Sequence, residues 1–289
     1  MQCRIRYSPS KICMLSKRCS NQVMLRPVSD IRPPDAAPII APGSVVAADA
    51  VLGPGVVLEA GVNLHSHVVL EGPLHIGART EVHPFTVLGG APQHLGYAGE
   101  PTALSVGADC IIREQVSIHR GTVRGGGKTV LGERVYVMAQ VHIGHDCRIG
   151  DGVILAGNCT LAGHVEVGDH AVIGGVAGIH QFCRIGERAM IGGCAAVPMD
   201  VIPFGSAMGN HARLAGLNVI GMKRAGISGA AIHTLRLAVR ELFLPGPVPF
   251  QERLAPLAER YAGSSEFAKV LGFIRSHKHR PILPFRHAE

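Results

Sequence analysis

The sequence predicts a mainly β protein, in which a β-helix of six-residue repeats is followed by a small α-helical domain. A large aliphatic residue recurs at every sixth position in two runs, which begin at Ile40 and Leu131. The residue four positions later is almost always small or β-branched, as at Ala50 and Cys147. Gly often follows the aliphatic, as at Gly53, where we expect it to supply the backbone freedom of a tight corner. This pattern is typical of a hexapeptide β-helix, and periods of two or 3.6 do not reproduce it.

The repeat covers twenty-one aliphatic positions. The first run is Ile40, Val46, Leu52, Leu58, Leu64, Leu70, Ile76, Val82 and Leu88. The second is Leu131, Val137, Ile143, Ile149, Leu155, Leu161, Val167, Ile173, Ile179, Ile185, Ile191 and Val197. Three repeats make one triangular coil, and stacked coils pair their backbones at about 4.8 Å. We therefore expect residues 18 positions apart to lie directly above one another.

Two insertions interrupt the repeat, near residues 91–104 and 123–129. Between them Val106, Ile112 and Ile118 keep the period. Loops that leave a regular scaffold often carry function, so both segments are candidates for a functional site.

The repeat divides the chain into three predicted segments. Residues 1–37 lack it and are rich in Arg and Ser, which predicts a disordered extension. A transit peptide and an over-extended start are the alternatives for this segment. Residues 38–202 form the predicted β-helix, and residues 203–289 the predicted helical domain.

Three segments of the last domain have helical periodicity, and we expect them to cover the end of the β-helix. They are residues 228–244, 250–261 and 264–278. The tail of this domain carries a basic cluster, Arg275, His277, Lys278, His279 and Arg280. It predicts either a solvated helix end or a docking patch for an acidic partner.

The charge distribution gives little support for nucleic-acid binding. The formal net charge is +7, but seven of the 28 Lys and Arg and two of the 21 Asp and Glu lie in residues 1–36. The remainder holds 21 basic and 19 acidic residues and few aromatics, so we expect no nucleic-acid partner.

The cysteines and the hydropathy pattern predict a cytoplasmic protein without a membrane span. Cys110, Cys147, Cys159 and Cys183 occupy the small position of the repeat, so we interpret them as core residues. Such unpaired usage fits a reducing compartment. No stretch approaches 18 consecutive apolar residues.

Histidines gather on one edge of the predicted β-helix. His145, Gly163 and Gln181 each follow an aliphatic by two positions, so they stack in successive coils. The histidines on or near this column are His119, His142, His145, His164 and His180. Five histidines converging on one edge indicate a functional cluster.

Two chemistries could use this cluster. Imidazoles could bind Zn²⁺, which needs three ligands at about 2.0–2.1 Å. One histidine could instead be a general base, and the adjacent Asp146 favours this for His145, because a carboxylate orients the ring and stabilises imidazolium. The sequence has no G-x-S-x-G nucleophile motif, so acyl transfer would be direct.

Six segments together resemble one enzyme family. They are QHLGYAGEPT (93–102), SIHRGTVRGGG (117–127), AQVHIGHDC (139–147), TLAGHVEV (160–167), GGVAGIHQFCRIG (174–186) and GNHARLAGLNVIGMKRAGIS (209–228). They resemble the UDP-N-acetylglucosamine O-acyltransferases that begin lipid A biosynthesis, over about residues 38–245.

The resemblance implies a left-handed parallel β-helix and a homotrimer with active sites between subunits. It further implies that acyl carrier protein donates a 3-hydroxyacyl chain to the 3-position of UDP-N-acetylglucosamine. No metal or organic cofactor is implied.

The resemblance also implies roles for individual residues. His145 matches the family's general base and Asp146 its partner, while the backbone N–H of Gly163 matches the oxyanion donor. Gly193 matches the position that sets acyl-chain length. The remaining implied substrate-binding positions are His94, His119, His142, His164, His180, Gln181, Asn218 and Arg224.

Four departures from the family pattern leave the acceptor sugar open. His94 stands where an Asp commonly contacts the sugar, and Gly96 stands where Lys is common. Ile220 replaces a Glu near the uridine, and Ala225 replaces a common Arg. Another sugar nucleotide, including one with a 3-amino group, is therefore an alternative acceptor.

Three rival functions remain at the level of sequence. A coenzyme A-dependent acetyltransferase would share the fold, but both long loops and the helical domain argue against it. A metalloenzyme of the carbonic anhydrase type commonly has two ligand histidines five residues apart, whereas His142 and His145 are three apart. A scaffold protein would not need the column of histidines.

Overall fold

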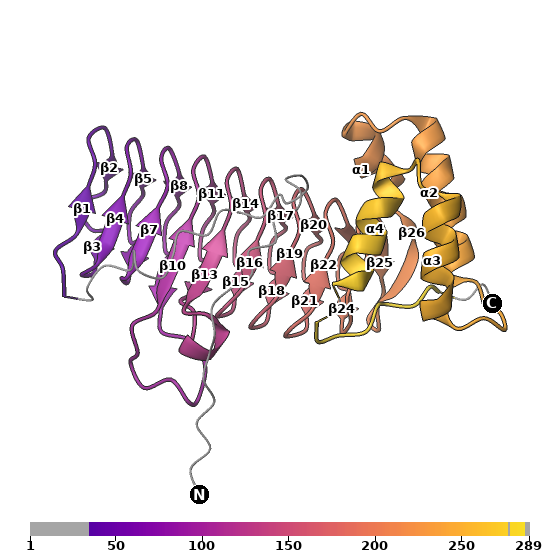
Figure 1. The fold of residues 1–289 in the computed structure, drawn as a ribbon. Coiled ribbons are helices and arrows are strands. Elements are labelled where there is room, and N and C mark those ends of the chain that lie inside the picture. Colours follow the sequence, from indigo (N-terminus) through magenta and orange to yellow (C-terminus); the bar gives the residue numbers. More distant parts are fainter. Residues whose placement is uncertain (1–34, 277, 287–289) are drawn as a thin grey trace, which may run out of the picture.

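Each six-residue repeat forms a short strand and a corner in the computed structural model, which describes residues 35–276 and 278–286. Stacked triangular coils build a left-handed parallel β-helix, with α-helices at its C-terminal end (Figure 1). The predicted fold class is confirmed. The predicted extension, residues 1–37, lies almost entirely outside the described residues.

The strands form three sheets, one along each side of the triangle. Sheet A holds β1 (Ile39–Ile40), β4 (Val56–Leu58), β7 (Leu74–Ile76), β10 (Ala103–Val106), β13 (Lys128–Leu131), β16 (Arg148–Ile149), β19 (Glu166–Val167) and β22 (Arg184–Ile185). Sheet B holds β2 (Val45–Val46), β5 (Asn63–Leu64), β8 (Glu81–Val82), β11 (Ile111–Ile112), β14 (Tyr136–Val137), β17 (Ile154–Leu155), β20 (Val172–Ile173), β23 (Met190–Ile191), β25 (Gly205–Met208) and β26 (Arg213–Leu217). Sheet C holds β3 (Val51–Leu52), β6 (Val69–Leu70), β9 (Val87–Gly90), β12 (Ser117–His119), β15 (His142–Ile143), β18 (Thr160–Leu161), β21 (Gly178–Ile179) and β24 (Ala196–Val197).

The register follows the 18-residue period. Asn63 pairs with Val45, and the aliphatics of the repeat point inward, so that Ile143 and Ile173 are fully buried. The number of residues between paired positions increases at the two insertions, so that Leu104 pairs with Leu74. The inserted loops span residues 91–102 and 120–127. Both predicted interruptions are confirmed.

The glycines that follow the aliphatics act differently from our expectation. Those at Gly77 and Gly168 have no positive φ, but a Cβ there would lie 2.5 Å from Ala108 N and 2.6 Å from Glu187 N of the next coil. Their role is close coil packing. The positive φ of the corners falls mostly on residues with side chains, such as Asp146 (φ 62°) and His164 (φ 62°).

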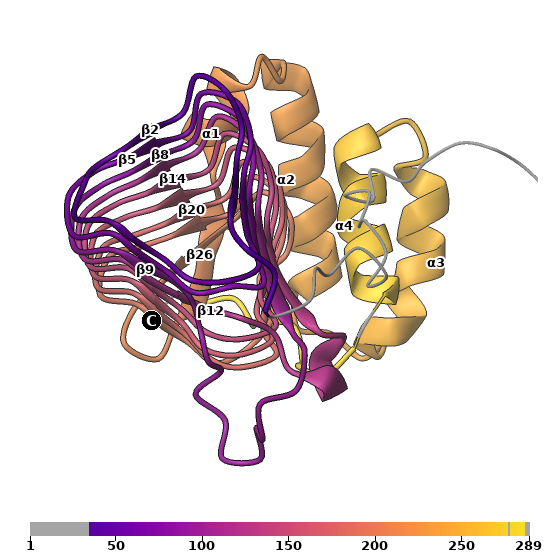
Figure 2. The ribbon, with the colours of Figure 1, turned by 90° about the vertical axis from the view of Figure 1, so that its left-hand side faces the viewer.

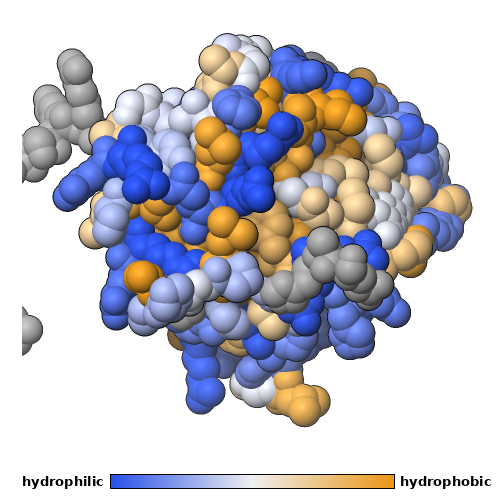
Figure 3. Space-filling view, turned by 90° about the vertical axis from the view of Figure 1, so that its right-hand side faces the viewer, coloured by the Kyte–Doolittle hydropathy of each residue, from blue (hydrophilic) through white to orange (hydrophobic). Residues whose placement is uncertain are grey.

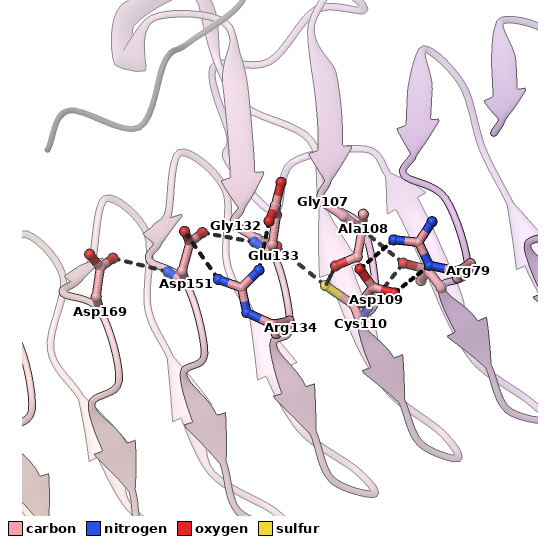
Figure 4. A network of polar contacts seen from close by, with 11 residues as sticks. Arg79, Gly107, Ala108, Asp109, Cys110, Gly132, Glu133, Arg134, Asp151 and Asp169 are labelled. Atoms are coloured by element: carbon pink, nitrogen blue, oxygen red, sulfur yellow. Dashed lines mark hydrogen bonds and ion pairs between the residues drawn. The ribbon is translucent and has the colours of Figure 1, made fainter. Parts of the chain in front are cut away.

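Polar side chains bind the corners between sheets A and B to one another (Figure 4). The Asp151 carboxylate accepts the Glu133 N–H at 2.9 Å, and the Asp169 carboxylate accepts the Asp151 N–H at 3.0 Å. Arg79 donates two hydrogen bonds of 2.6 Å to Asp109. The two aspartate contacts satisfy backbone donors that the corners leave without a strand partner, and the Arg79–Asp109 pair joins side chains of neighbouring coils.

Four α-helices follow the last strands: α1 (Val219–Arg224), α2 (Gly229–Phe243), α3 (Phe250–Arg260) and α4 (Ser265–Arg275). The three predicted helices correspond to α2, α3 and α4. Helix α1 was not predicted, and neither were β25 and β26, which continue sheet B beyond residue 202. No helix among the described residues is long and apolar enough to cross a membrane.

A buried ion pair holds α4 against the β-helix. Arg184 of β22 contacts Asp200 at 2.7 Å, and its Nη1 donates to the Ser276 carbonyl and hydroxyl at 2.9 Å. The guanidinium also lies 4.2 Å from the ring centre of Phe273. Because both charges are buried, each depends on the other for compensation.

Candidate active site at one corner of the β-helix

The corner between sheets C and A carries both loops and a column of histidines. The chain passes this corner after each of the strands β9, β12, β15, β18 and β21. The histidines met there, in five successive coils, are His94, His119, His145, His164 and His180. Both loops project beyond the triangular outline of the coils (Figure 2).

His145 and Asp146 form a hydrogen-bonded pair at the centre of this corner. His145 Nδ1 lies 2.7 Å from Asp146 Oδ2, and the Asp146 side chain has no exposed surface. Since a carboxylate only accepts, the imidazole proton is on Nδ1 and the lone pair is on Nε2. The lone pair of Nε2 therefore remains available to accept a proton.

The second loop fixes the Asp146 carboxylate. The Thr122 N–H donates to Oδ1 and the Thr122 hydroxyl to Oδ2, both at 2.7 Å. Thr122 also caps a short 3₁₀ helix, η2 (Val123–Gly125), and a side chain on Gly125 would overlap the Asp146 carboxyl group. Sequence reasoning missed both residues, and the available signal for Thr122 was only that Thr is a preferred N-cap residue.

Gly163 belongs to the coil that follows the coil of His145, and it lies against the His145 ring. A Cβ on Gly163 would be 2.7 Å from Cε1 and 2.8 Å from Nε2 of His145, so a side chain there would displace the imidazole. No described residue accepts a hydrogen bond from the Gly163 N–H. The corner thus places a free backbone donor beside the His145 imidazole.

Aromatic contacts continue the column on both sides of His145. The rings of His94 and His164 meet it edge-on, with centroid distances of 5.6 and 5.1 Å. His164 stacks on Phe182 at 4.4 Å, and Phe182 contacts His279 at 5.1 Å. Phe182 and His279 were not predicted as site residues.

Burial favours the neutral form of His164. Desolvation lowers the pKa of His164, while the Asp146 carboxylate, 3.5 Å from its Nε2, acts in the opposite direction and His145 lowers it further. A neutral His164 adds no positive charge beside the His145 ring.

A second histidine pair lies on the outer face of sheet C. The rings of His119 and His142 are 5.2 Å apart, and His142 Nδ1 lies 2.8 Å from Ser117 Oγ. His119 Nδ1–H donates to the Ala91 carbonyl at 2.6 Å, which ties it to the first loop. Burial lowers the pKa of His142, and His119 adds to this effect.

In the next coil Gln181 lies above Gly163 and His180 above Ala162, where the C-terminal segment reaches both residues. Arg280 Nη2 is 2.8 Å from His180 Nδ1, and Lys278 Nζ is 2.6 Å from Glu166 Oε1. The basic cluster was expected to be solvated or to bind a partner. Lys278 and Arg280 instead bind the coils of this chain.

Three predicted site residues lie elsewhere. Gly193 is at the corner between sheets B and C. Asn218 caps α1 and donates to the Arg188 carbonyl at 2.9 Å, and Arg224 is in the last turn of that helix. Arg188 follows β22, at the corner between sheets A and B. Within one chain these residues do not meet His145.

Two groups of described residues could hold a metal ion by proximity. They are His145, Asp146 and His164, and His65, Glu81 and His83; in each, the ligand atoms lie within 4.8 Å of one another. Two ligands of one tetrahedral zinc ion lie about 3.3 Å apart, whereas His145 Nδ1 and Asp146 Oδ2 are 2.7 Å apart. That distance is typical of a hydrogen bond.

Comparisons with known proteins support an acyl-transfer site. Residues 200–283 match the family model described as Udp N-acetylglucosamine O-acyltransferase, domain 2. Residues 128–163 match the model for bacterial transferase hexapeptide repeats.

Curated proteins named acyl-[acyl-carrier-protein]–UDP-N-acetylglucosamine O-acyltransferase are similar to most of the chain. The protein of Caulobacter vibrioides is 56% identical over 219 residues, which cover 75% of this chain and 83% of that protein. The protein of Thermodesulfovibrio yellowstonii is 46% identical over 72% of this chain and 81% of its own length.

Solved structures agree over nearly the whole length. One UDP-N-acetylglucosamine acyltransferase matches with a TM-score of 0.83 and 37% identity, over 89% of this chain and 97% of its own. LpxA of Acinetobacter baumannii matches with a TM-score of 0.75 and 38% identity, over 85% and 97% of the two chains. The Arabidopsis enzyme matches with a TM-score of 0.63 and 31% identity, over 85% and 100%.

Proposed function

Because the chain belongs to the family of the UDP-N-acetylglucosamine O-acyltransferases, we propose that it transfers a 3-hydroxyacyl chain from acyl carrier protein to UDP-N-acetylglucosamine. The acyl chain joins the 3-position of the sugar, as the first step of lipid A biosynthesis in the cytoplasm. The observation that carries this proposal is the His145–Asp146 pair beside the Gly163 N–H.

His145 acts as the general base. Its Nε2 takes the proton of the sugar 3-hydroxyl while the oxygen attacks the thioester carbon, because a neutral hydroxyl is a weak nucleophile. The C–S bond of the tetrahedral intermediate then breaks, and the imidazolium returns the proton to the departing thiolate. An ester and the free thiol of the carrier protein result, without an acyl-enzyme and without a metal or organic cofactor.

Asp146 and Gly163 stabilise the two charges that arise during the reaction, the imidazolium of His145 and the oxyanion of the tetrahedral intermediate. The Asp146 carboxylate holds Nδ1–H at 2.7 Å and stabilises the imidazolium, and Thr122 keeps that carboxylate in place. The free Gly163 N–H donates to the oxyanion of the intermediate. The other predicted substrate-binding residues of this corner would contact the two substrates around His145. They are His94, His119, His142, His164, His180 and Gln181.

A homotrimer would complete the site with Gly193, Asn218 and Arg224 of a neighbouring copy. Apolar side chains are exposed on sheet B and sheet C and at the corner between them, whereas the outer face of sheet A is largely polar from β7 onward. The exposed large apolar residues are Val45, Val51, Phe85, Val87, Ile111, Val176 and Met208. The polar side chains on sheet A are His75, Ser105, Arg148, Glu166 and Arg184. Packing sheet B of one copy on sheet C of the next would bury the apolar set.

A donor and acceptor screen with the purified protein tests the proposal. We expect 3-hydroxyacyl-acyl carrier protein and UDP-N-acetylglucosamine to give the 3-O-acyl product, with acetyl-coenzyme A inactive. The acceptor arm includes the 3-amino analogue, because His94 replaces an Asp and lies next to His145. A preference for coenzyme A donors, or for the 3-amino acceptor over the hydroxyl, would contradict it.

A further inference from the structure

The C-terminal segment, residues 278–286, is bound to the last coils of the β-helix. After α4 the chain returns to these coils (Figure 1). The Asp200 N–H donates to the Pro281 carbonyl at 2.9 Å, and the Leu283 N–H donates to the Asp200 carbonyl at 2.8 Å. The Arg286 N–H donates to the Leu214 carbonyl at 2.9 Å. Backbone hydrogen bonds therefore hold the segment in one register on the coils.

This register places Lys278 on the outer face of sheet A, and His279 and Arg280 on the histidine corner, the corner between sheets C and A that carries the column of histidines. Lys278 binds both carboxylate oxygens of Glu166, at 2.6 and 2.9 Å. The His279 ring contacts Phe182, which stacks on His164. Arg280 reaches His180, which the proposed function assigns to substrate binding.

Arg280 makes a two-point contact with His180 and Gln181. Its Nε–H donates to the Gln181 carbonyl at 3.1 Å, and Nη2 lies 2.8 Å from His180 Nδ1. A guanidinium has five donors and no acceptor, so Nδ1 must be the acceptor. The proton of the neutral His180 ring is then on Nε2.

The opposite tautomer has its own partner in the same place. His180 Nδ1 lies 3.2 Å from the Gln181 carbonyl oxygen, which could accept an Nδ1–H. That arrangement would move the ring's lone pair to Nε2. Arg280 disfavours it, because an Nδ1–H would face the N–H that Nη2 directs at the same atom.

We propose that Arg280 is a positioning residue that holds His180 in the Nε2–H tautomer, so that the ring offers a hydrogen-bond donor to a substrate oxygen. The role of His180 in binding rests on the proposed function. The acyl donor and the sugar nucleotide both present carbonyl or phosphate oxygens, which only accept. With the other tautomer, two acceptors would face each other and the substrate would lose a hydrogen bond.

The first test measures the tautomer without any substrate. Side-chain ¹⁵N NMR distinguishes a protonated from an unprotonated ring nitrogen, and the His180→Ala variant assigns the signals. We expect protonated Nε2 in the wild type and in Arg280→Lys, which keeps a donor, and a shift towards protonated Nδ1 in Arg280→Met. Protonated Nδ1 in the neutral wild-type ring would overturn the proposal, whether or not the enzyme accepts the proposed substrates.

The second test is a double-mutant cycle on kcat/KM with 3-hydroxyacyl-acyl carrier protein and UDP-N-acetylglucosamine. Arg280→Met should lower kcat/KM about tenfold, and Arg280→Lys should restore most of it. In the His180→Ala background Arg280→Met should have no further effect.

Lys278→Met is the matched control, because it removes a contact of the same segment that does not touch His180. It should leave kcat/KM within about twofold of the wild type. Equal losses in both variants, or an unchanged effect of Arg280→Met without His180, would show that the segment only stabilises the fold. Melting temperatures identify any variant that fails to fold, and the NMR comparison with Arg280→Lys still decides the proposal in that case.

Discussion

The imidazole of His145 occupies the space that a side chain at Gly163 would need, since a Cβ there would lie 2.7 Å from the ring Cε1. The proposed base and the proposed oxyanion donor are thus adjacent only because residue 163 lacks a side chain. Successive coils bring the two residues together across 18 positions of sequence.

Gly163→Ala should lower kcat by about 10²–10³-fold, the usual cost of losing an oxyanion donor, because the added methyl displaces the imidazole and the oxyanion together. Steady-state kinetics on the folded variant measures the effect. Gly272→Ala in α4 is the control, because nothing lies within 4 Å of a Cβ at that position. Equal activity of the two variants would contradict the assignment of Gly163.

Asp146→Asn should lower kcat by about 10²–10⁴-fold. The amide can no longer stabilise imidazolium, and it lets His145 adopt the tautomer with the proton on Nε2. Thr122→Ser keeps both donors to the carboxylate and should remain close to the wild type. Near-normal turnover of Asp146→Asn would show that His145 needs no oriented partner.

The folded protein should lose stability as the pH falls below about 6.5. Burial lowers the pKa values of His142, His164 and His83, so near pH 6 the unfolded chain binds more protons than the folded one. Their contribution to the free energy of unfolding is complete above the pKa that a histidine has in the unfolded chain. It declines as the pH falls towards the lower pKa values of the folded protein. Thermal melts between pH 7.5 and 5.5 measure the decline.

The variant His142→Gln should flatten this pH dependence, and His233→Gln, at an exposed position of α2, should not. A melting temperature that stays constant or rises as the pH falls would refute the direction derived from the buried histidines.

Gly193→Met should shift the acyl-chain preference to shorter chains. Gly157, Gly175 and Gly193 stack in successive coils, and a Cβ on Gly193 would already lie 3.3 Å from the Gly175 carbonyl oxygen. Each displaced methylene is worth about 0.8 kcal/mol, or roughly fourfold in kcat/KM. Competition between acyl carrier proteins of different chain length measures the ratio, and an unchanged ratio would place the length limit elsewhere.

The sequence predicted the fold and the histidine corner because both follow from one short period. Once residues 18 positions apart are stacked, His145, Gly163 and Gln181 must share a corner, and the insertion at 120–127 must leave the stack near them. Neither the fold nor the position of this corner requires knowledge of which distant side chains contact each other.

The missed features depend on contacts that the period does not encode. Thr122 acts through a hydrogen bond to Asp146, 24 positions away, and Arg280 through contacts with His180 and Gln181 about one hundred positions away. Helix α1 has only six residues, and its cap Asn218 is fixed by the Arg188 carbonyl rather than by helical periodicity.

The kcat of His145→Ala tests the central claim most directly. General-base loss costs about 10²–10⁴-fold, so turnover with 3-hydroxyacyl-acyl carrier protein and UDP-N-acetylglucosamine should fall at least that far. Oligomeric state and melting temperature should be kept, UDP-sugar binding should weaken much less, and chelators should leave the wild type unaffected. Near-normal turnover of His145→Ala, or loss of wild-type activity on chelation, would contradict the general-base mechanism and favour a metal bound by His145, Asp146 and His164.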